Sequence, residues 1–168
     1  MEPAATYPYR AEGWERQIYP MPAFAMLLVS DVEKSSRWYQ DALGFADVFT
    51  MRGRDGVPLL AHLRWCTYGD VLLTPDRTPI DGPRGLGVRL NFATVSADDL
   101  AARARDAGAN VVDGPADRPW NARDVTIADP DGYRLTFSAP QPHVVSDARP
   151  SFDQLMAKVQ DSIEGSDR

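Results

Sequence analysis

The sequence predicts an α+β fold of two βαβββ modules whose curved mixed sheets surround a shared cleft, and three observations support this prediction. Turn glycines recur at a nearly constant offset, since Gly69 and Gly132 lie 63 positions apart and Gly44 and Gly108 lie 64 apart. The order strand, helix and three strands can be followed twice along the chain. The stretch 118–137, RPWNARDVTIADPDGYRLTF, has strand-like flanks around a turn. Such a fixed period indicates a duplicated unit.

Each module opens with an apolar strand that leads into a helix. A serine follows each strand at the N-cap, where its hydroxyl can accept a hydrogen bond from the third helical amide. Each helix is expected to end before a glycine, which readily takes the positive φ found just past a helix end. The strands are 24–29 and 88–95, the serines Ser30 and Ser96, the last helical residues about Leu43 and Ala107, and the glycines Gly44 and Gly108.

The DPDG turn closes the last predicted hairpin. Asp129 can accept hydrogen bonds from its own backbone, Pro130 presets φ, and Gly132 suits the closing position. A weaker copy of this hairpin, LRWCTYGDVLLTP, turns near Gly69. We expect the strands 24–29 and 134–138 to lie in one sheet around the cleft.

The chain divides at stretches that are rich in turn-forming residues. PDRTPIDGPRGLG, at 75–87, separates the two repeated units. We expect an N-terminal arm at 1–20, a first module at 21–75, a linker at 76–87, a second module at 88–139, and a Pro-rich segment with a C-terminal helix at 140–168.

Two motifs in these modules resemble the glyoxalase/bleomycin-resistance/dioxygenase superfamily, also called vicinal oxygen chelate proteins. VSDVEKSSRWYQDALGF resembles the first-helix signature of that superfamily. The PW, the arginine and the DPDG of 118–137 resemble its last hairpin. The resemblance covers about 21–139 and implies the fold, whereas the function stays open because this fold hosts several chemistries and binding proteins.

Enzymes of that superfamily hold a divalent metal at four positions, in the first and last strands of the two modules. The resemblance places these positions at Phe24, Leu73, Thr136 and Arg89, or Leu90 if the register slips by one. None of these side chains is a good ligand for a divalent cation. We therefore expect no metal and no other cofactor, and the chain resembles the metal-free, bleomycin-resistance-like branch.

A metal site elsewhere is not favoured by the distribution of histidine and cysteine. His62 and Cys66 lie four apart in a predicted strand, a span of roughly 13 Å. We favour a structural or surface role for this pair over ligation.

Composition excludes several classes of partner. The net charge of −6, without a basic stripe, argues against nucleic acid. The sequence contains no run of about 18 apolar residues, so we expect no membrane span. Because the first residues lack the apolar region of a signal peptide and Cys66 is the single cysteine, we expect a cytoplasmic protein.

The predicted cleft is the candidate ligand site. Strand alternation puts Phe24, Met26 and Leu28 on one face, which the family pattern turns toward the cleft together with Leu73. A mostly apolar groove with a few polar points is typical of a site for an organic ligand. The candidate ligand-binding residues are Phe24, Met26, Trp65, Leu73, Arg89, Asn91, Trp120, Arg134 and Thr136. Trp65 suits the core and the cleft about equally, and Trp120 is the favoured aromatic contact.

These observations favour a binding protein over an enzyme, and no catalytic residue is assigned. The resemblance implies a metal-free protein that sequesters an organic small molecule, such as an antibiotic or another secondary metabolite. One alternative is a metal-independent isomerase or lyase that holds an anion with Arg89 or Arg134. Another is a module that binds a second protein through its terminal helix.

The segment 151–163 predicts an amphipathic helix beyond the minimal fold. Ser151 and Gln154 form a capping box, and the apolar residues recur at helical spacing. These residues are Phe152, Leu155, Met156, Val159 and Ile163. The helix can pack on its own domain, clamp a partner subunit or cover the cleft. Because superfamily members commonly pair, the resemblance implies a homodimer.

Overall fold

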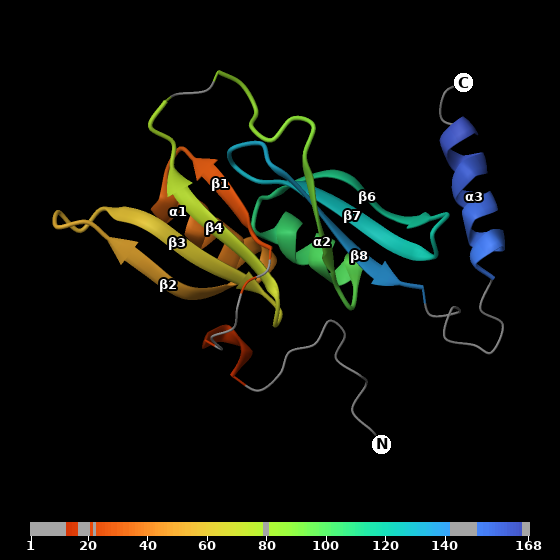
Figure 1. Ribbon diagram of the computed structural model, residues 1–168, viewed down its shortest axis with the longest axis horizontal. Helices are drawn as coiled ribbons and strands as arrows, with labels where there is room; N and C mark the ends of the chain where they lie inside the picture. The colour runs from red at the N-terminus through yellow and green to blue at the C-terminus, as the bar shows by residue number, and fades with distance from the viewer. Residues whose placement is uncertain (1–12, 17–20, 22, 79–80, 142–150, 166–168) are drawn as a thin grey trace.

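The computed structural model describes residues 13–16, 21, 23–78, 81–141 and 151–165, and most of the expected N-terminal arm lies outside these ranges. Two four-stranded mixed sheets are each paired with a helix, and a further helix stands at one end of the molecule, outside both sheets (Figure 1). The chain therefore has the expected α+β fold of two βαβββ modules with a C-terminal helix.

The first module forms sheet A, with the strand order β1-β4-β3-β2. β1 runs parallel to β4, whereas the other neighbours are antiparallel. A π-helical turn, η2, extends α1 toward β2. The elements are β1 (Ala25–Val29), α1 (Val32–Trp38), η2 (Tyr39–Leu43), β2 (Ala46–Arg52), β3 (Pro58–Trp65) and β4 (Gly69–Pro75).

The second module forms sheet B, whose order β5-β8-β7-β6 repeats that of sheet A and confirms the duplication. The expectation that strands 24–29 and 134–138 share one sheet is wrong, because each first strand pairs with the last strand of its own module. The elements are β5 (Arg89–Ala93), α2 (Ala97–Asp106), β6 (Asn110–Arg118), β7 (Ala122–Ala128) and β8 (Arg134–Pro140). The short helix η1 (Trp14–Arg16) precedes the modules, and α3 (Phe152–Gly165) follows them.

The helix ends follow the sequence signals with one exception. Ser96 caps α2 by accepting a hydrogen bond from the amide of Asp99, as expected. In α1 the cap is Asp31, which accepts from the amide of Lys34, and not Ser30. Gly44 ends the first helix with a φ of 91°, in the left-handed region where glycine is favoured.

One hydrophobic core joins the two modules on their helix-covered faces. Phe45 follows η2 and contacts Phe92 of β5, with ring centroids 5.5 Å apart. Trp65 at the end of β3 contacts Phe137 of β8 at 5.0 Å. These aromatic contacts between the modules fix the relative positions of sheets A and B.

The DPDG turn connects the modules a second time. Asp131 accepts hydrogen bonds from the amide of Ser30 and from the buried Arg84 of the linker, at 2.9 and 2.7 Å. Asp129 accepts from the amides of Asp131 and Tyr133 within the turn, as the sequence predicts. The turn therefore both closes the hairpin and ties the second module to the end of β1.

Candidate functional site

Each sheet has a face covered by its helix and an opposite face, which we call the open face. On sheet A the open face carries a row formed by Met26, Leu72, His62 and Phe49, one residue from each strand. Five large apolar side chains of this face are between 42% and 54% exposed: Phe24, Met26, Leu28, Phe49 and Met51. A cluster of exposed apolar side chains is typical of a surface that meets another molecule.

Phe24 and Met26 lie on the open face as expected, but Leu73 does not. Leu73 pairs with Leu27 on the helix-covered face and is completely buried. Its neighbour Leu72 occupies the open face. The sequence-based placement of Leu73 in the cleft is therefore corrected by one position.

The error comes from the different lengths of the two hairpin loops. The β3–β4 loop holds residues 66–68 between paired residues, whereas the β7–β8 loop holds 129–133. Counting four residues onward from Gly69 and from Gly132 therefore does not reach equivalent positions. A shift of one residue moves a strand side chain to the other face.

Trp65 belongs to the core, one of the two placements that its sequence position allowed. Its ring packs against Phe45 and Phe137, and its Nε1 donates a hydrogen bond of 2.7 Å to the carbonyl of Ala93. Trp65 thus connects the modules and is not exposed for stacking on a ligand.

The open face of sheet B brings four of the expected site residues together. Arg89 of β5 is directly opposite Arg134 of β8, and Asn91 is opposite Thr136 in the next row. The hydroxyls of Thr136 and Thr126 are 2.8 Å apart. This face is polar, in contrast to the apolar open face of sheet A.

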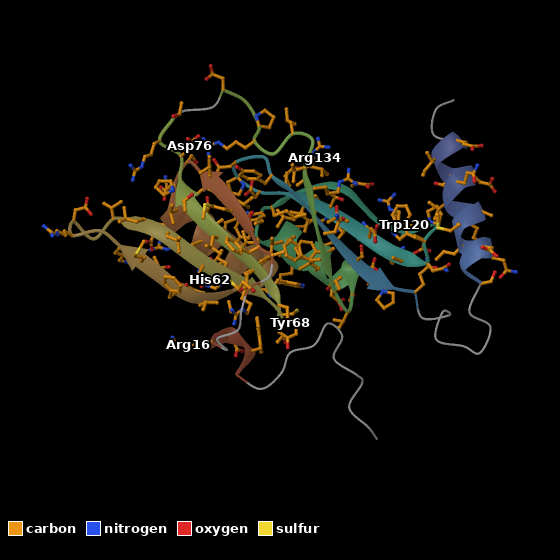
Figure 2. The ribbon with its side chains drawn as sticks, in the orientation of Figure 1. Arg16, His62, Tyr68, Asp76, Trp120 and Arg134 are labelled. Carbon is orange, nitrogen blue, oxygen red and sulfur yellow. The ribbon has the colours of Figure 1, made fainter. Side chains whose placement is uncertain are left out.

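Trp120 stands at the far end of sheet B from Arg134 (Figure 2). It lies in the β6–β7 turn, next to Asn121, which has a positive φ of 59°. Trp120 is 46% exposed, and its Nε1 donates to Oδ2 of the buried Asp124 at 3.2 Å. Within the described part of the chain, Oδ1 of Asp124 has no hydrogen-bond partner. Trp120 therefore offers a half-exposed aromatic ring that is held in place by a buried carboxylate.

A buried polar cluster on sheet A was not expected from the sequence. His62 Nε2 lies 2.6 Å from Oδ1 of Asp70, and Arg64 Nε donates to the same oxygen at 2.8 Å. Arg64 also donates to the carbonyl of Trp14 in η1, which is itself buried. Alternation along β3 puts His62 and Arg64 on one face, and the hairpin register places Asp70 opposite Arg64.

Burial controls the protonation of this cluster. It raises the pKa of Asp70 to about 6. Burial and then the charge of Arg64 lower the pKa of His62, although Asp47 acts in the opposite direction. At neutral pH we therefore expect an ionised Asp70 that accepts from Arg64 and from a neutral His62.

Comparison with family models assigns the fold to a family. Residues 22–137 match the model of the Glyoxalase/Bleomycin resistance protein/Dioxygenase superfamily. The chain belongs to this superfamily. A comparison with curated proteins found no match.

Several solved structures are similar to this chain in fold. An antibiotic-binding protein from Streptomyces sp. CB03234, TnmS3, is 25% identical, with a TM-score of 0.56 over 74% of this chain and 100% of that one. A glyoxalase/bleomycin resistance protein from the same organism is 26% identical, with a TM-score of 0.54 over 69% of this chain and 99% of that one. TioX from Micromonospora sp. ML1, at 20% identity and a TM-score of 0.56, covers 70% and 98% of the two chains and shows the fold alone.

The metal-dependent enzymes of the superfamily provide a test for the residues found here. By the family pattern, the metal ligands would stand at the positions of Phe24 and Leu72 in the first module and of Arg89 and Thr136 in the second. Apolar side chains cannot ligate, and an arginine is always protonated. The described residues contain no group of three or more His, Cys, Asp or Glu side chains that could hold a metal ion. The residues present therefore do not fit the superfamily's metal.

Proposed function

We propose that this protein binds an organic small molecule without a metal, and that it sequesters an antibiotic or a related secondary metabolite. Sheet B carries the proposal, because the polar residues Arg89, Asn91, Arg134 and Thr136 lie together on its open face and the exposed Trp120 stands at its other end. Such a combination of an aromatic ring and a few polar points suits the recognition of an organic ligand. Sequestration lowers the free ligand concentration by mass action and requires no covalent step.

The proposal draws further support from the comparisons. The superfamily includes bleomycin resistance proteins in its description, and TnmS3 is described as an antibiotic-binding protein. No helix in the described part of the chain is long and apolar enough to cross a membrane. The proposal includes a cytoplasmic location, with which the lone Cys66 agrees, and a homodimer that covers the apolar open face of sheet A.

A thermal-shift screen against aromatic natural products, followed by titration with tryptophan fluorescence, tests this function. Trp120→Ala should weaken binding of the best ligand by about tenfold, because the variant loses stacking and apolar contact. The matched control is Tyr68→Ala, which removes an exposed aromatic ring from the β3–β4 loop and should leave the affinity unchanged. Equal effects of the two variants would argue against the assigned face.

Two further measurements separate binding from catalysis. The ligand should be recovered chemically unchanged after long incubation with the protein. Elemental analysis of protein purified without a chelator or an affinity tag should show no stoichiometric Zn, Ni, Fe or Mn. Metal that leaves only on unfolding would contradict the metal-free part of the proposal.

The buried His62–Asp70 pair favours one alternative, a metal-independent isomerase or lyase. A neutral histidine held by a carboxylate is a common general base, and this pair lies at one end of an apolar face. If the protein turns a ligand over, His62→Gln should remove turnover while the ligand still binds. Equal turnover by the variant would exclude His62 as the base.

A further inference from the structure

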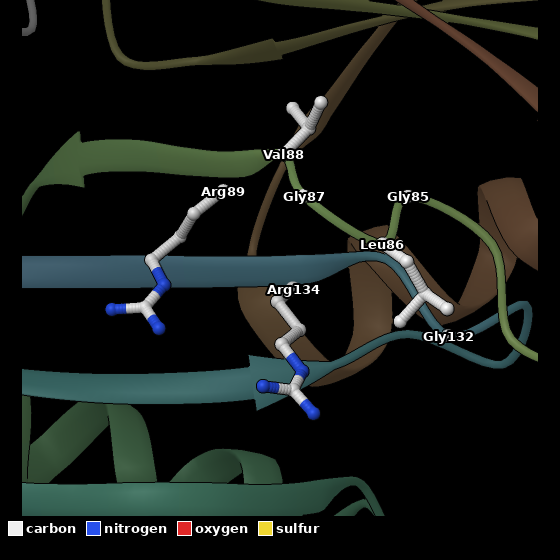
Figure 3. Close-up of a pocket in the computed structure, with 7 residues that line it drawn as sticks. All are labelled: Gly85, Leu86, Gly87, Val88, Arg89, Gly132 and Arg134. Carbon is white, nitrogen blue, oxygen red and sulfur yellow. The ribbon is translucent and has the colours of Figure 1, made fainter.

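Arg89 and Arg134 form a pair of like charges on neighbouring strands. They are directly opposite in the parallel β5–β8 ladder, and both side chains are exposed. Figure 3 shows the two guanidinium groups projecting to the same side of sheet B, beside the linker. The fold therefore holds two permanent positive charges close together.

The other arginines of the strands do not share this situation. Arg52 and Arg64 have carboxylate partners at 2.8 Å, in Glu33 and Asp70. The same holds for the arginines of β6 and β7, which pair with aspartates: Arg118 with Asp113, and Arg123 with Asp98. Among the described residues, Arg89 and Arg134 have no ion-pair partner.

Folding does not explain why this pair lacks an acidic partner. Like charges that face each other across neighbouring strands destabilise a sheet. The chain carries 24 acidic residues against 18 basic ones, so a compensating carboxylate would be easy to supply. Two uncompensated guanidinium groups suggest that the missing negative charge comes from a bound molecule.

The surroundings of the pair are suited to an organic anion. The arginines border a cavity of about 290 Å³ that is also lined by the linker residues 85–88 and by Gly132. Leu86 and Val88 expose apolar side chains at this cavity. Guanidinium groups bind carboxylate, sulfonate or phosphate oxygens through two parallel hydrogen bonds, which a lysine cannot do.

We infer that Arg89 and Arg134 bind the acidic group of an organic anion whose apolar body contacts Leu86 and Val88. This inference rests on the proposed function and narrows its ligand to one chemical class. Neutral aromatic molecules of the same shape would bind the same face far more weakly, because they leave the two charges uncompensated.

Two dyes with nearly the same aromatic body test the inference. Anilinonaphthalene sulfonate carries an anionic group, and N-phenylnaphthylamine lacks it. The wild-type protein should bind the sulfonate more tightly, with an affinity that falls as salt is added. Arg89→Gln/Arg134→Gln should weaken sulfonate binding by about tenfold or more and leave the affinity for the neutral dye unchanged.

The matched control removes the same charge from exposed positions elsewhere. Arg54→Gln/Arg77→Gln changes two exposed arginines outside the cavity and should leave the affinity for both dyes unchanged. Equal weakening by both double variants would overturn the inference, because it would show an effect of net charge alone. Equal affinity of the wild-type protein for both dyes would overturn it too, but would leave small-molecule binding itself in place. Failure of both dyes to bind would count against the inference and the proposed function together.

A measurement without ligand tests the premise. If the two arginines repel each other, Arg134→Gln should raise Tm by about 1–3 °C at low salt. The gain should vanish at high salt, where the repulsion is screened. A lower Tm for this variant would show that the pair is not strained and would overturn the inference.

Discussion

At the scale of single residues, Asp70 illustrates two opposing effects on a carboxyl group. Its side chain is completely buried, and it accepts hydrogen bonds from Arg64 and His62. The arginine favours the ionised form, whereas the loss of water favours the neutral form. Burial is the stronger effect, because it raises the pKa of Asp70 to about 6.

This raised pKa predicts how stability depends on pH. Between the usual pKa of 3.8 and about 6, the folded protein holds the proton of Asp70 more tightly than the unfolded chain does. The contribution of Asp70 protonation to the free energy of unfolding is therefore fully present below pH 3.8 and is lost as the pH rises through about 6. His62 acts in the opposite sense, since its pKa is lowered and its stabilisation is lost as the pH falls.

Asp70→Asn isolates the contribution of the carboxyl. We expect the free energy of unfolding of the wild type, minus that of the variant, to decline as the pH rises across this interval. Urea denaturation at several pH values measures the difference. The control is Asp55→Asn, an exposed position in the β2–β3 loop, whose difference from the wild type should not follow this trend. A difference for Asp70→Asn that grows with pH would mean that Arg64 outweighs burial.

At the scale of elements, the DPDG turn predicts where the two modules are coupled. The side chain of Asp131 is buried, with one oxygen shared by the amide of Ser30 and by Arg84, and the other accepting from Ser35 at 3.3 Å. Asp131→Ala leaves the buried Arg84 with Asp76 as its remaining carboxylate partner. We expect a loss of about 3 kcal/mol in the free energy of unfolding, at the lower end for a broken buried pair.

Urea denaturation checks this loss. Asp81→Ala is the matched control, because it removes an exposed carboxylate from the same linker and should change stability by less than about 0.5 kcal/mol. A loss for Asp131→Ala as small as that of the control would show that Asp131 contributes little to holding the modules together.

The ends of the helices were easier to predict from the sequence than the sheet face on which a strand side chain lies. Gly44 and Ser96 mark helix ends through local backbone chemistry, so their signals survive folding unchanged. The placement of Leu73 failed because loop length, which sets strand register, is not visible in a spacing of glycines. Ser30 likewise matched a local capping pattern, yet its amide bonds to Asp131, about a hundred positions away.

The open faces differ in how far the sequence could describe them. The family pattern placed Arg89, Asn91, Arg134 and Thr136 on the cleft surface, and the parallel register of β5 and β8 brings them onto one face of sheet B. The His62–Asp70 contact depended on the antiparallel register of β3 and β4 and was missed. Trp65 could not be assigned, because its core role depends on Phe137 of the other module.

At the scale of the whole molecule, the apolar stripe of α3 is not fully covered by the rest of its own chain. Its capping box forms as expected, with reciprocal hydrogen bonds between Ser151 and Gln154. Met156 and Ile163 of the stripe are exposed, which disagrees with complete packing on its own domain. Exposed apolar side chains along one helix face favour contact with a second molecule.

We therefore expect light scattering to show a homodimer at micromolar concentration, with α3 contributing to the interface. Met156→Lys/Ile163→Lys puts two charges into the stripe and should raise the fraction of monomer, because buried charges without partners are costly. Ala157→Lys/Gln160→Lys adds the same charge at exposed positions outside the stripe and should leave the dimer intact. A monomeric wild type would reject the homodimer. A dimer unaffected by either variant would leave α3 outside the interface. Met26→Lys/Phe49→Lys tests the apolar open face of sheet A, which the proposed dimer covers, and should separate the subunits in either case.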